Sequence, residues 1–224
     1  MRKLGDTDVL NKTVALRVDL NVPVKDGNVL DDARILAIIP TLQYLQKQNS
    51  KIILISHFGR PETGVFDSKF SLLPVAKSLG EILNQEIPLF TSIDEVNFNA
   101  NISLIENIRF LSGELTNDLD LSKKLSDLAD VYVFDAFGTS HRPHASTYGA
   151  IQAAHSSCAG FLLEDETRAL KKATDSQESP TLSIVGGSKV SSKLEVIKSL
   201  VQISDEVLTC LLYTSDAADE SSSV

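Results

Sequence analysis

The arginines and histidines of this chain gather at a few points of the sequence. There are seven arginines and four histidines, and several of them follow directly after short runs of apolar residues. Guanidinium forks match carboxylates and phosphates bidentately, so such a set suits an anion with more than one charged group, such as a small phosphorylated acid. The polar residues after the runs are Asp19 and Asn21, His57 and Arg60, Arg109, and His141, Arg142 and His144, while Arg34 opens the first helical segment.

Each arginine also has a simpler reading, because ion pairs with nearby carboxylates are common on protein surfaces and of small energetic value. For any single arginine the two readings are about equally good, but four arginines on consecutive loops favour a shared anion. His141 and His144 are better read as residues that fix their loop. His57 stands beside a Gly59-Arg60-Pro61 turn and is the better ligand candidate.

The runs that precede these residues predict the strands that position them. They are rich in β-branched and apolar residues, and segments of helical period lie between them, which is the pattern of a parallel α/β sheet. We therefore expect a doubly wound, Rossmann-like sheet in three layers, whose ligand crevice lies outside the carboxyl ends of the strands. The expected strands are residues 13–18, 51–56, 102–105, 131–134 and 182–185, with a shorter one possible at 87–90.

Spacings of i, i+3, i+4 and i+7 between apolar residues predict the helices. The first carries Pro40 in its interior, where we expect a kink, and Ser71 is the expected cap of the second. The last should expose an apolar stripe and so favour aggregation. The helices expected are residues 35–45, 72–83, 119–129, 163–173 and 191–203, and the stripe of the last consists of Leu194, Ile197, Leu200 and Val201.

A second phosphate-binding feature follows the last expected strand. Gly186 and Gly187 would let a phosphate approach the backbone, and Lys189 and Lys193 stand four residues apart, on one face of the helix that begins there. The segment matches neither standard nucleotide fingerprint. A tight turn followed by solvated lysines explains it about as well.

Composition limits the class of protein. The chain has 224 residues, 42% of them hydrophobic, and a net charge of −9, which fits a globular protein and disfavours nucleic acid and anionic membranes as partners. Cys158 and Cys210 form no C-x-x-C pair, and no metal-ligand cluster is evident. No signal peptide or membrane span is recognisable. We expect a cytoplasmic protein.

The polar stretch 174–180 ends in a proline and is the best domain boundary. We expect a first domain over residues 1–174, the start of a second α/β domain over 175–208, and a disordered, non-native tail over 209–224. One strand and one helix cannot bury a closed core, so the second domain looks truncated.

Five motifs, in this order, resemble the phosphoglycerate kinase family over the chain from its start to about Val207. The motifs are Arg17-Val18-Asp19-Leu20-Asn21-Val22-Pro23, Ser56-His57-Phe58-Gly59-Arg60-Pro61, Glu106-Asn107-Ile108-Arg109-Phe110, residues 135–142, and Gly186-Gly187-Ser188-Lys189-Val190. The stretch from Cys210 to Val224 resembles nothing in the family. Phe134 stands where many members carry a polar residue, which we read as tolerated variation.

The resemblance implies a glycolytic enzyme with two α/β domains that close on each other. The first would bind 3-phosphoglycerate or 1,3-bisphosphoglycerate, and the second ATP or ADP with Mg²⁺. Arg34 would be the catalytic arginine, and Lys189 and Lys193 would meet the nucleotide phosphates, Lys189 reaching the transferred group. The acid would be bound by Asp19, Leu20 (through its backbone), Asn21, Arg34, His57, Phe58, Gly59, Arg60, Arg109 and Arg142.

Two further expectations concern this chain itself. Positioning ATP against the acid is most of the catalysis, so a chain without the rest of the nucleotide domain should bind the acid with negligible turnover. We expect a monomer. The competing hypothesis is a non-catalytic anion-binding α/β module or a phosphosugar isomerase on a similar sheet.

Overall fold

The computed structural model describes residues 1–174, 180–186 and 193–209. Its contacts divide the chain into two units, Met1–Glu166 and Thr167–Val224. This division falls inside helix α6 (Phe161–Thr174), eight residues before the expected boundary at residue 174. The expected domain limits therefore stay a prediction.

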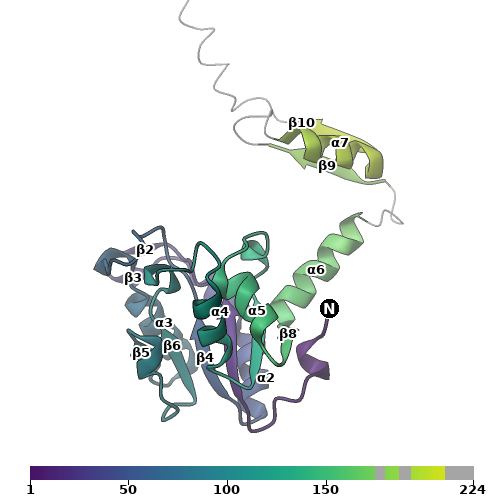
Figure 1. The fold of residues 1–224 in the computed structure, drawn as a ribbon. Coiled ribbons are helices and arrows are strands. Elements are labelled where there is room, and N and C mark those ends of the chain that lie inside the picture. Colours follow the sequence, from purple (N-terminus) through teal and green to yellow (C-terminus); the bar gives the residue numbers. More distant parts are fainter. Residues whose placement is uncertain (175–179, 187–192, 210–224) are drawn as a thin grey trace, which may run out of the picture. The chain divides into compact units, whose positions relative to one another are not determined.

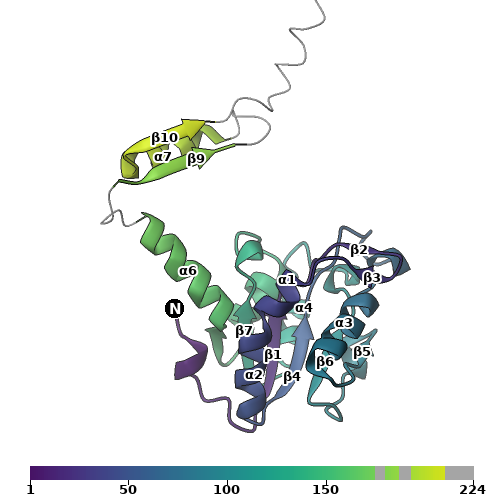
Figure 2. The ribbon, with the colours of Figure 1, turned by 180° about the vertical axis from the view of Figure 1, so that it is seen from behind.

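Six parallel strands form the sheet of the first unit, in the order β5-β6-β4-β1-β7-β8 (Figures 1 and 2). Four of them were predicted, and a fifth, β5, was named as possible. The exception, β8, consists of Ser, Cys and Ala and so lacks the β-branched residues that mark a strand. The bounds are β1 (Thr13–Val18), β4 (Lys51–Ile55), β5 (Leu89–Phe90), β6 (Ile102–Ile105), β7 (Val131–Asp135) and β8 (Ser157–Ala159).

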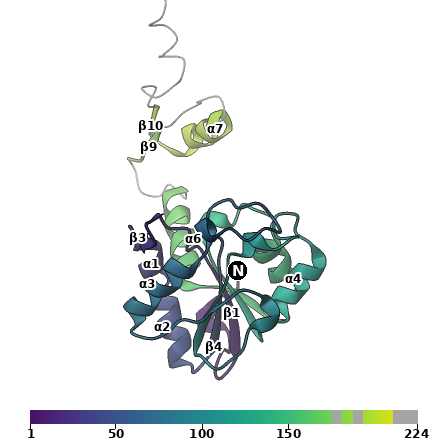
Figure 3. The ribbon, with the colours of Figure 1, turned by 90° about the vertical axis from the view of Figure 1, so that its left-hand side faces the viewer.

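Helices cover both faces of this sheet, as Figure 3 shows. On β1, Val14, Leu16 and Val18 belong to one buried apolar cluster, which also contains residues of α1, α2 and α3. Ala15, on the opposite face, belongs to the cluster that contains residues of α4 and α5. The expected three-layer, doubly wound architecture is confirmed. The helices are α1 (Ala33–Ala37), α2 (Ile39–Lys47), α3 (Leu73–Leu83), α4 (Leu119–Ser126) and α5 (Ala150–Ala153).

Proline divides the first helical segment, as its position predicted. Helix α1 ends at Ala37 and α2 begins at Ile39, with Ile38 as the junction. Pro40 lies in the first turn of α2, where its missing N–H costs no hydrogen bond. The expected kink is thus a break between two short helices.

Two helix starts show how the sequence sets the boundaries. The Ser71 hydroxyl accepts the N–H of Leu73 over 3.1 Å, so the serine caps α3 one residue before its formal N-cap. Asp118 accepts the N–H of Leu121 over 2.9 Å at the start of α4, which ends at Ser126, three residues earlier than expected. Helix α6 is longer than expected at both ends.

Short elements connect the layers. The hairpin of β2 (Val24–Lys25) and β3 (Asn28–Val29) was not predicted, although its turn residues Asp26 and Gly27 both have positive φ, as this tight turn requires. The one-turn helices are Leu4–Asp6, Ser68–Phe70, Ile93–Glu95, Ile108–Phe110 and Phe137–Thr139, and a π-helical turn spans Ala145–Gly149.

In the second unit, β9 (Leu182–Val185) was predicted, and it pairs in parallel with β10 (Glu206–Thr209), which was not. Helix α7 (Leu194–Ile203) connects them. Of its expected stripe, Leu194 and Val201 are exposed, whereas Ile197 and Leu200 are partly buried. Residue 209 lies in β10, and the rest of the expected tail is outside the described residues.

Candidate anion-binding site

Four strands bring their carboxyl ends together at one edge of the first unit's sheet. In the sheet, β6, β4, β1 and β7 are consecutive neighbours. Asp19 follows β1, His57 lies two residues past the end of β4, Arg109 is in the turn after β6, and Arg142 is in the loop after β7. The chain passes from β1 to β4 on one side and later reaches β7 on the other, which is the switch point where such sheets bind ligands.

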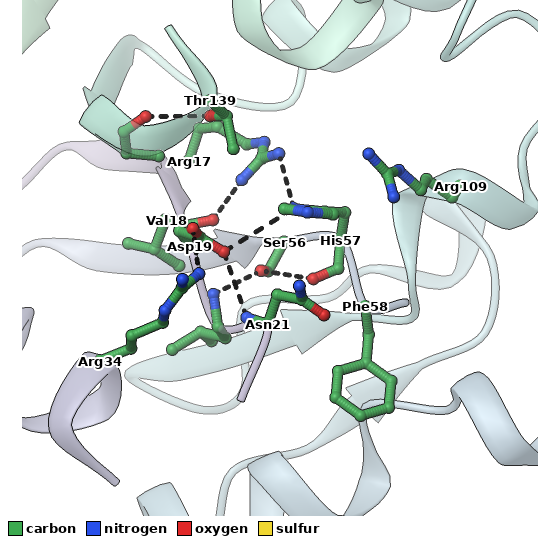
Figure 4. A network of polar contacts seen from close by, with 12 residues as sticks. Arg17, Val18, Asp19, Asn21, Arg34, Ser56, His57, Phe58, Arg109 and Thr139 are labelled. Atoms are coloured by element: carbon green, nitrogen blue, oxygen red, sulfur yellow. Dashed lines mark hydrogen bonds and ion pairs between the residues drawn. The ribbon is translucent and has the colours of Figure 1, made fainter. Parts of the chain in front are cut away.

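Arg17 and His57 form the centre of the site (Figure 4). Arg17 is only 1% exposed, and its Nη2 lies 3.4 Å from Nδ1 of His57. Its Nη1 donates to the carbonyl of Val18. Burial lowers the pKa of His57 from 6.5 to about 2, helped by the nearby charges of Arg17, Arg109, Arg142 and Arg34. The imidazole is therefore neutral, and the positive charge of the site belongs to the arginines.

Asp19 links three of the expected ligand residues. Its Oδ2 accepts a hydrogen bond from the Arg34 guanidinium, and its Oδ1 accepts the N–H of Asn21 over 3.2 Å. The same Oδ1 lies 3.9 Å from Nδ1 of His57. Arg34 remains 53% exposed on its side chain, so it is held at one end and still accessible.

The loop of residues 57–60 is held by hydrogen bonds to its backbone. The N–H of Gly59 donates to Oδ1 of Asn21 over 2.8 Å, and its carbonyl accepts from Arg109. Gly59 has φ +58°, and a Cβ there would lie 2.3 Å from the Phe70 ring, so only glycine fits. Asn107 binds both backbone groups of Phe58, accepting its N–H over 3.0 Å and donating to its carbonyl over 2.6 Å.

Two expected ligand residues have buried, apolar side chains. Leu20 is fully buried in the apolar cluster below the site, and its N–H donates to Oγ of Ser56 over 2.9 Å. The Phe58 ring is 8% exposed and packs in the same cluster. Both residues anchor their loops in the apolar cluster, and the side chains that face the site belong to neighbouring residues.

Like charges accumulate around Arg109. Burial lowers its pKa most, and Arg142, Arg17 and Arg60 lower it further, because a charged guanidinium is less favourable beside others. Arg60 is exposed and Arg142 half-buried. A bound anion would relieve this repulsion, so the arrangement is suited to bind an anion.

A cavity of about 250 Å³ opens beside Asp19 and Arg34. Gly138, from the loop after β7, and Glu166, from α6, contribute to its lining. Burial raises the pKa of Glu166, and the negative charges of Asp135 and Asp19 raise it further.

Three polar residues at this site were missed from the sequence as functional residues. Arg17 was read as part of a strand, and Glu114 and Ser146 were not singled out. The Ser146 hydroxyl donates to Oε1 of Glu114 over 2.6 Å and accepts from Nε of Arg17 over 2.9 Å. The available signal was Arg17 itself, because a charge inside an apolar central strand must have a buried partner.

The two histidines after β7 make contacts within their own loop and with Glu114. The backbone N–H of His144 donates to Oγ1 of Thr147 over 3.2 Å, and its Nδ1 lies 3.9 Å from Oε1 of Glu114. Burial lowers the pKa of His144, against the charge of Glu114, which raises it. His141 accepts a 3.4 Å contact from Nε of Arg142.

The expected nucleotide-binding residues are only partly described. Lys189 lies outside the described residues. Lys193 is the N-cap residue of α7, so it precedes the helix on whose face it was expected, and its Nζ donates to the carbonyl of Gly186 over 2.6 Å. Within the described ranges no group of three His, Cys, Asp or Glu residues could hold a metal ion, and no helix is long and apolar enough to cross a membrane.

Known proteins resemble this chain over most of its length. A family model described as phosphoglycerate kinase matches residues 4–213, six residues beyond the expected end of the resemblance at Val207. A phosphoglycerate kinase of Desulfovibrio desulfuricans is 46% identical over 207 residues, which are 92% of this chain and 53% of that protein. One of Francisella tularensis subsp. novicida is 50% identical over 200 residues, covering 88% and 51%.

Solved structures agree with the sequence matches. Phosphoglycerate kinase from Coxiella burnetii superposes with a TM-score of 0.86 at 39% identity, covering 92% of this chain and 54% of that one. The enzyme from Pyrococcus horikoshii gives 0.80 at 33% identity, covering 93% and 55%. The chain thus spans about half the length of the relatives it matches. By the match of both sequence and fold, it belongs to the phosphoglycerate kinase family.

Proposed function

We propose that this chain carries the acid-binding half of a phosphoglycerate kinase. The reaction would be the reversible glycolytic phosphoryl transfer between 1,3-bisphosphoglycerate and ADP, which gives 3-phosphoglycerate and ATP. The observation that carries the proposal is the set of arginines on consecutive strand-end loops around His57, with a mutual repulsion that an anion would relieve.

The two ends of the acid would bind to different parts of this set. Asp19 and Asn21 would meet the carboxylate and hydroxyl end, with Leu20 contributing backbone, because a carboxylate oxygen can accept from the substrate hydroxyl. The phosphate would meet the loop of residues 57–60 together with Arg109 and Arg142. Bidentate guanidinium contacts would give this end most of its affinity.

Arg34 would act in the transfer itself. Its exposed side chain is anchored by Asp19 at the edge of the 250 Å³ cavity. In phosphoryl transfer the protein works mainly by positioning and by stabilising charge on the transferring group. An arginine that is held at one end and accessible at the other suits this role.

The nucleotide would bind through Lys189 and Lys193, Lys189 reaching the transferred phosphoryl group. Mg²⁺ would enter with ATP or ADP as part of the substrate. We propose that the 224-residue chain binds the acid but turns over negligibly. The protein would be a cytoplasmic monomer.

Isothermal titration calorimetry with 3-phosphoglycerate tests acid binding. The wild-type chain should bind, and Arg109→Ala and Arg60→Ala should each weaken binding by roughly 10- to 100-fold, since a charge-assisted hydrogen bond contributes about 1.5–3 kcal/mol. Arg2→Ala is the matched control, because Arg2 contacts Ser156, outside the strand-end site. Absence of binding to the wild-type chain would overturn the proposal.

A coupled assay tests the reaction. The 224-residue chain should give no ATP-dependent transfer above background, and the chain extended by a family-type C-terminal half should restore it. Transfer by the chain alone would refute the expected inactivity. Binding without transfer in the extended protein would favour the competing anion-binding module or phosphosugar isomerase.

A further inference from the structure

A continuous row of buried polar groups runs from Glu114 to His57. Oε1 of Glu114 accepts from Oγ of Ser146 over 2.6 Å, and the same Oγ accepts from Nε of Arg17 over 2.9 Å. Nη2 of Arg17 then lies 3.4 Å from Nδ1 of His57. None of the four residues is more than 4% exposed, so water does not compete for these contacts.

The direction of the last contact determines where the imidazole carries its proton. A guanidinium has only donors and stays protonated in proteins, so Nδ1 of His57 must be the acceptor. In a neutral imidazole the proton is then on Nε2. The other tautomer would turn Nδ1–H toward Oδ1 of Asp19, 3.9 Å away, and would set two N–H groups against each other at Arg17.

Ser146 contacts Arg17 directly, and Glu114 holds Ser146 in place. Each of the guanidinium nitrogens Nε, Nη1 and Nη2 has a partner, namely Ser146, the carbonyl of Val18 and His57. Ser146 is itself fixed, because its N–H donates to Oε2 of Glu114 over 2.9 Å and its carbonyl accepts from the Tyr132 hydroxyl over 2.7 Å. The charge of Glu114 also raises the pKa of Arg17 against the lowering effect of burial.

We propose that Glu114 and Ser146 are positioning residues that hold Arg17 against Nδ1 of His57, so that His57 offers a neutral Nε2–H to a bound phosphoryl group. Only the identity of the anion rests on the proposed function; the tautomer and its cause are properties of the protein without ligand. His57 thus contributes a directional hydrogen-bond donor to anion binding, and the arginines contribute positive charge.

Nitrogen-15 NMR of the histidine rings in the full 224-residue chain tests the tautomer, with the His57 signals assigned from their loss in His57→Gln. At pH 7 we expect a pyridine-like Nδ1 and a pyrrole-like Nε2. In Glu114→Gln and in Ser146→Ala, a measurable fraction of His57 should shift to the Nδ1–H tautomer facing Asp19. A purely structural role for Glu114 would not move this ratio.

Glu106→Gln is the matched control. Glu106 is also a buried carboxylate beside a strand end, but it accepts from Ser71, Leu72 and Asn107, none of them a cation. Its neutralisation should leave the His57 tautomer unchanged. Backbone amide spectra establish that each variant is folded, and Ser146→Ala is the milder change if Glu114→Gln does not fold.

A second experiment measures the affinity for 3-phosphoglycerate by calorimetry. Glu114→Gln should lower the affinity by about ten-fold, because Arg17 and the Nε2–H donor lose their fixed positions. An Nδ1–H tautomer or an imidazolium in the wild-type chain would overturn the inference, as would folded Glu114→Gln and Ser146→Ala variants with the wild-type tautomer ratio. Failure of the wild-type chain to bind 3-phosphoglycerate would instead refute the proposed function and leave the tautomer result intact.

Discussion

Two buried ionisable groups lie at the same edge of the sheet in opposite surroundings. His57, beyond β4, is next to arginines and stays neutral. Asp135, the last residue of β7, is fully buried among neutral donors, accepting from the Thr41 hydroxyl over 2.6 Å and from the N–H of Leu163 over 2.8 Å. Burial raises the pKa of Asp135 despite these hydrogen bonds.

The comparison shows that His57 belongs to a binding region, whereas Asp135 anchors a helix to the sheet. Around Asp135 the donors are supplied by the fold and Gly160 packs against the carboxylate, so the group ties the first turn of α6 to the sheet. Around His57 the guanidinium charges exceed the neighbouring carboxylates, and a ligand must supply the rest. The two groups should therefore respond to pH in opposite directions, which the following experiments test.

The largest expected effect is the loss of stability in acid caused by His57. The unfolded chain takes up a proton on this residue below pH 6.5, whereas the folded chain does so only near pH 2. Acid therefore favours unfolding, by about 3 kcal/mol at pH 4, since each pKa unit corresponds to about 1.4 kcal/mol. Urea unfolding followed by circular dichroism should show this part of the pH dependence disappearing in His57→Gln.

His155→Gln is the control for that experiment, because His155 is exposed. It should keep the wild-type difference in unfolding free energy between pH 7 and pH 4. The same difference in His57→Gln as in the wild-type chain would show that the buried imidazole is not held neutral.

A smaller effect is expected on the anchor side, from Gly160→Ala. A Cβ at this position would lie 2.2 Å from Cγ of Asp135 and 2.5 Å from both carboxylate oxygens. Relieving the overlap should cost about 2 kcal/mol of unfolding free energy, the usual range for overpacking. Gly5→Ala is the control, because a Cβ there would meet nothing within 4 Å. Equal stability of both variants would show that Asp135 is loosely held.

The smallest effect concerns Thr41→Val, which removes one donor from Asp135. Burial raises the pKa of Asp135 in the folded chain, so its contribution to stability falls as pH rises above 3.8, the reverse of the His57 effect. Losing the hydroxyl should cost about 1 kcal/mol, and more at pH 8 than at pH 4, because the ionised carboxylate needs the donor most. Urea unfolding at both pH values measures this, with exposed Thr63→Val as control. A smaller loss of unfolding free energy at pH 8 than at pH 4 would contradict the role of Thr41 as a donor to the ionised Asp135.

Much of the site could be predicted from the sequence because its residues follow strands that are easy to recognise. Asp19, His57, Arg109 and Arg142 each come shortly after an apolar run, and parallel strands bring their carboxyl ends to one edge. The break at Pro40 followed from backbone chemistry alone. The strand β8 was missed because Ser, Cys and Ala carry weak β-propensity. Both β8 and β10 also depend on pairing with strands that are distant in the sequence.

The sequence by itself determined the fold class, the family and the loops that carry the charge, because apolar periodicity and motif spacing are local properties of the chain. Only the tertiary structure decided which groups meet. Arg17 and Ser146 are 129 residues apart and Ser146 and Glu114 are 32 apart, so no local pattern predicts their contacts. The protonation states of His57 and Asp135 depend on burial and on the charges that folding brings near them, and these exist only in the packed molecule.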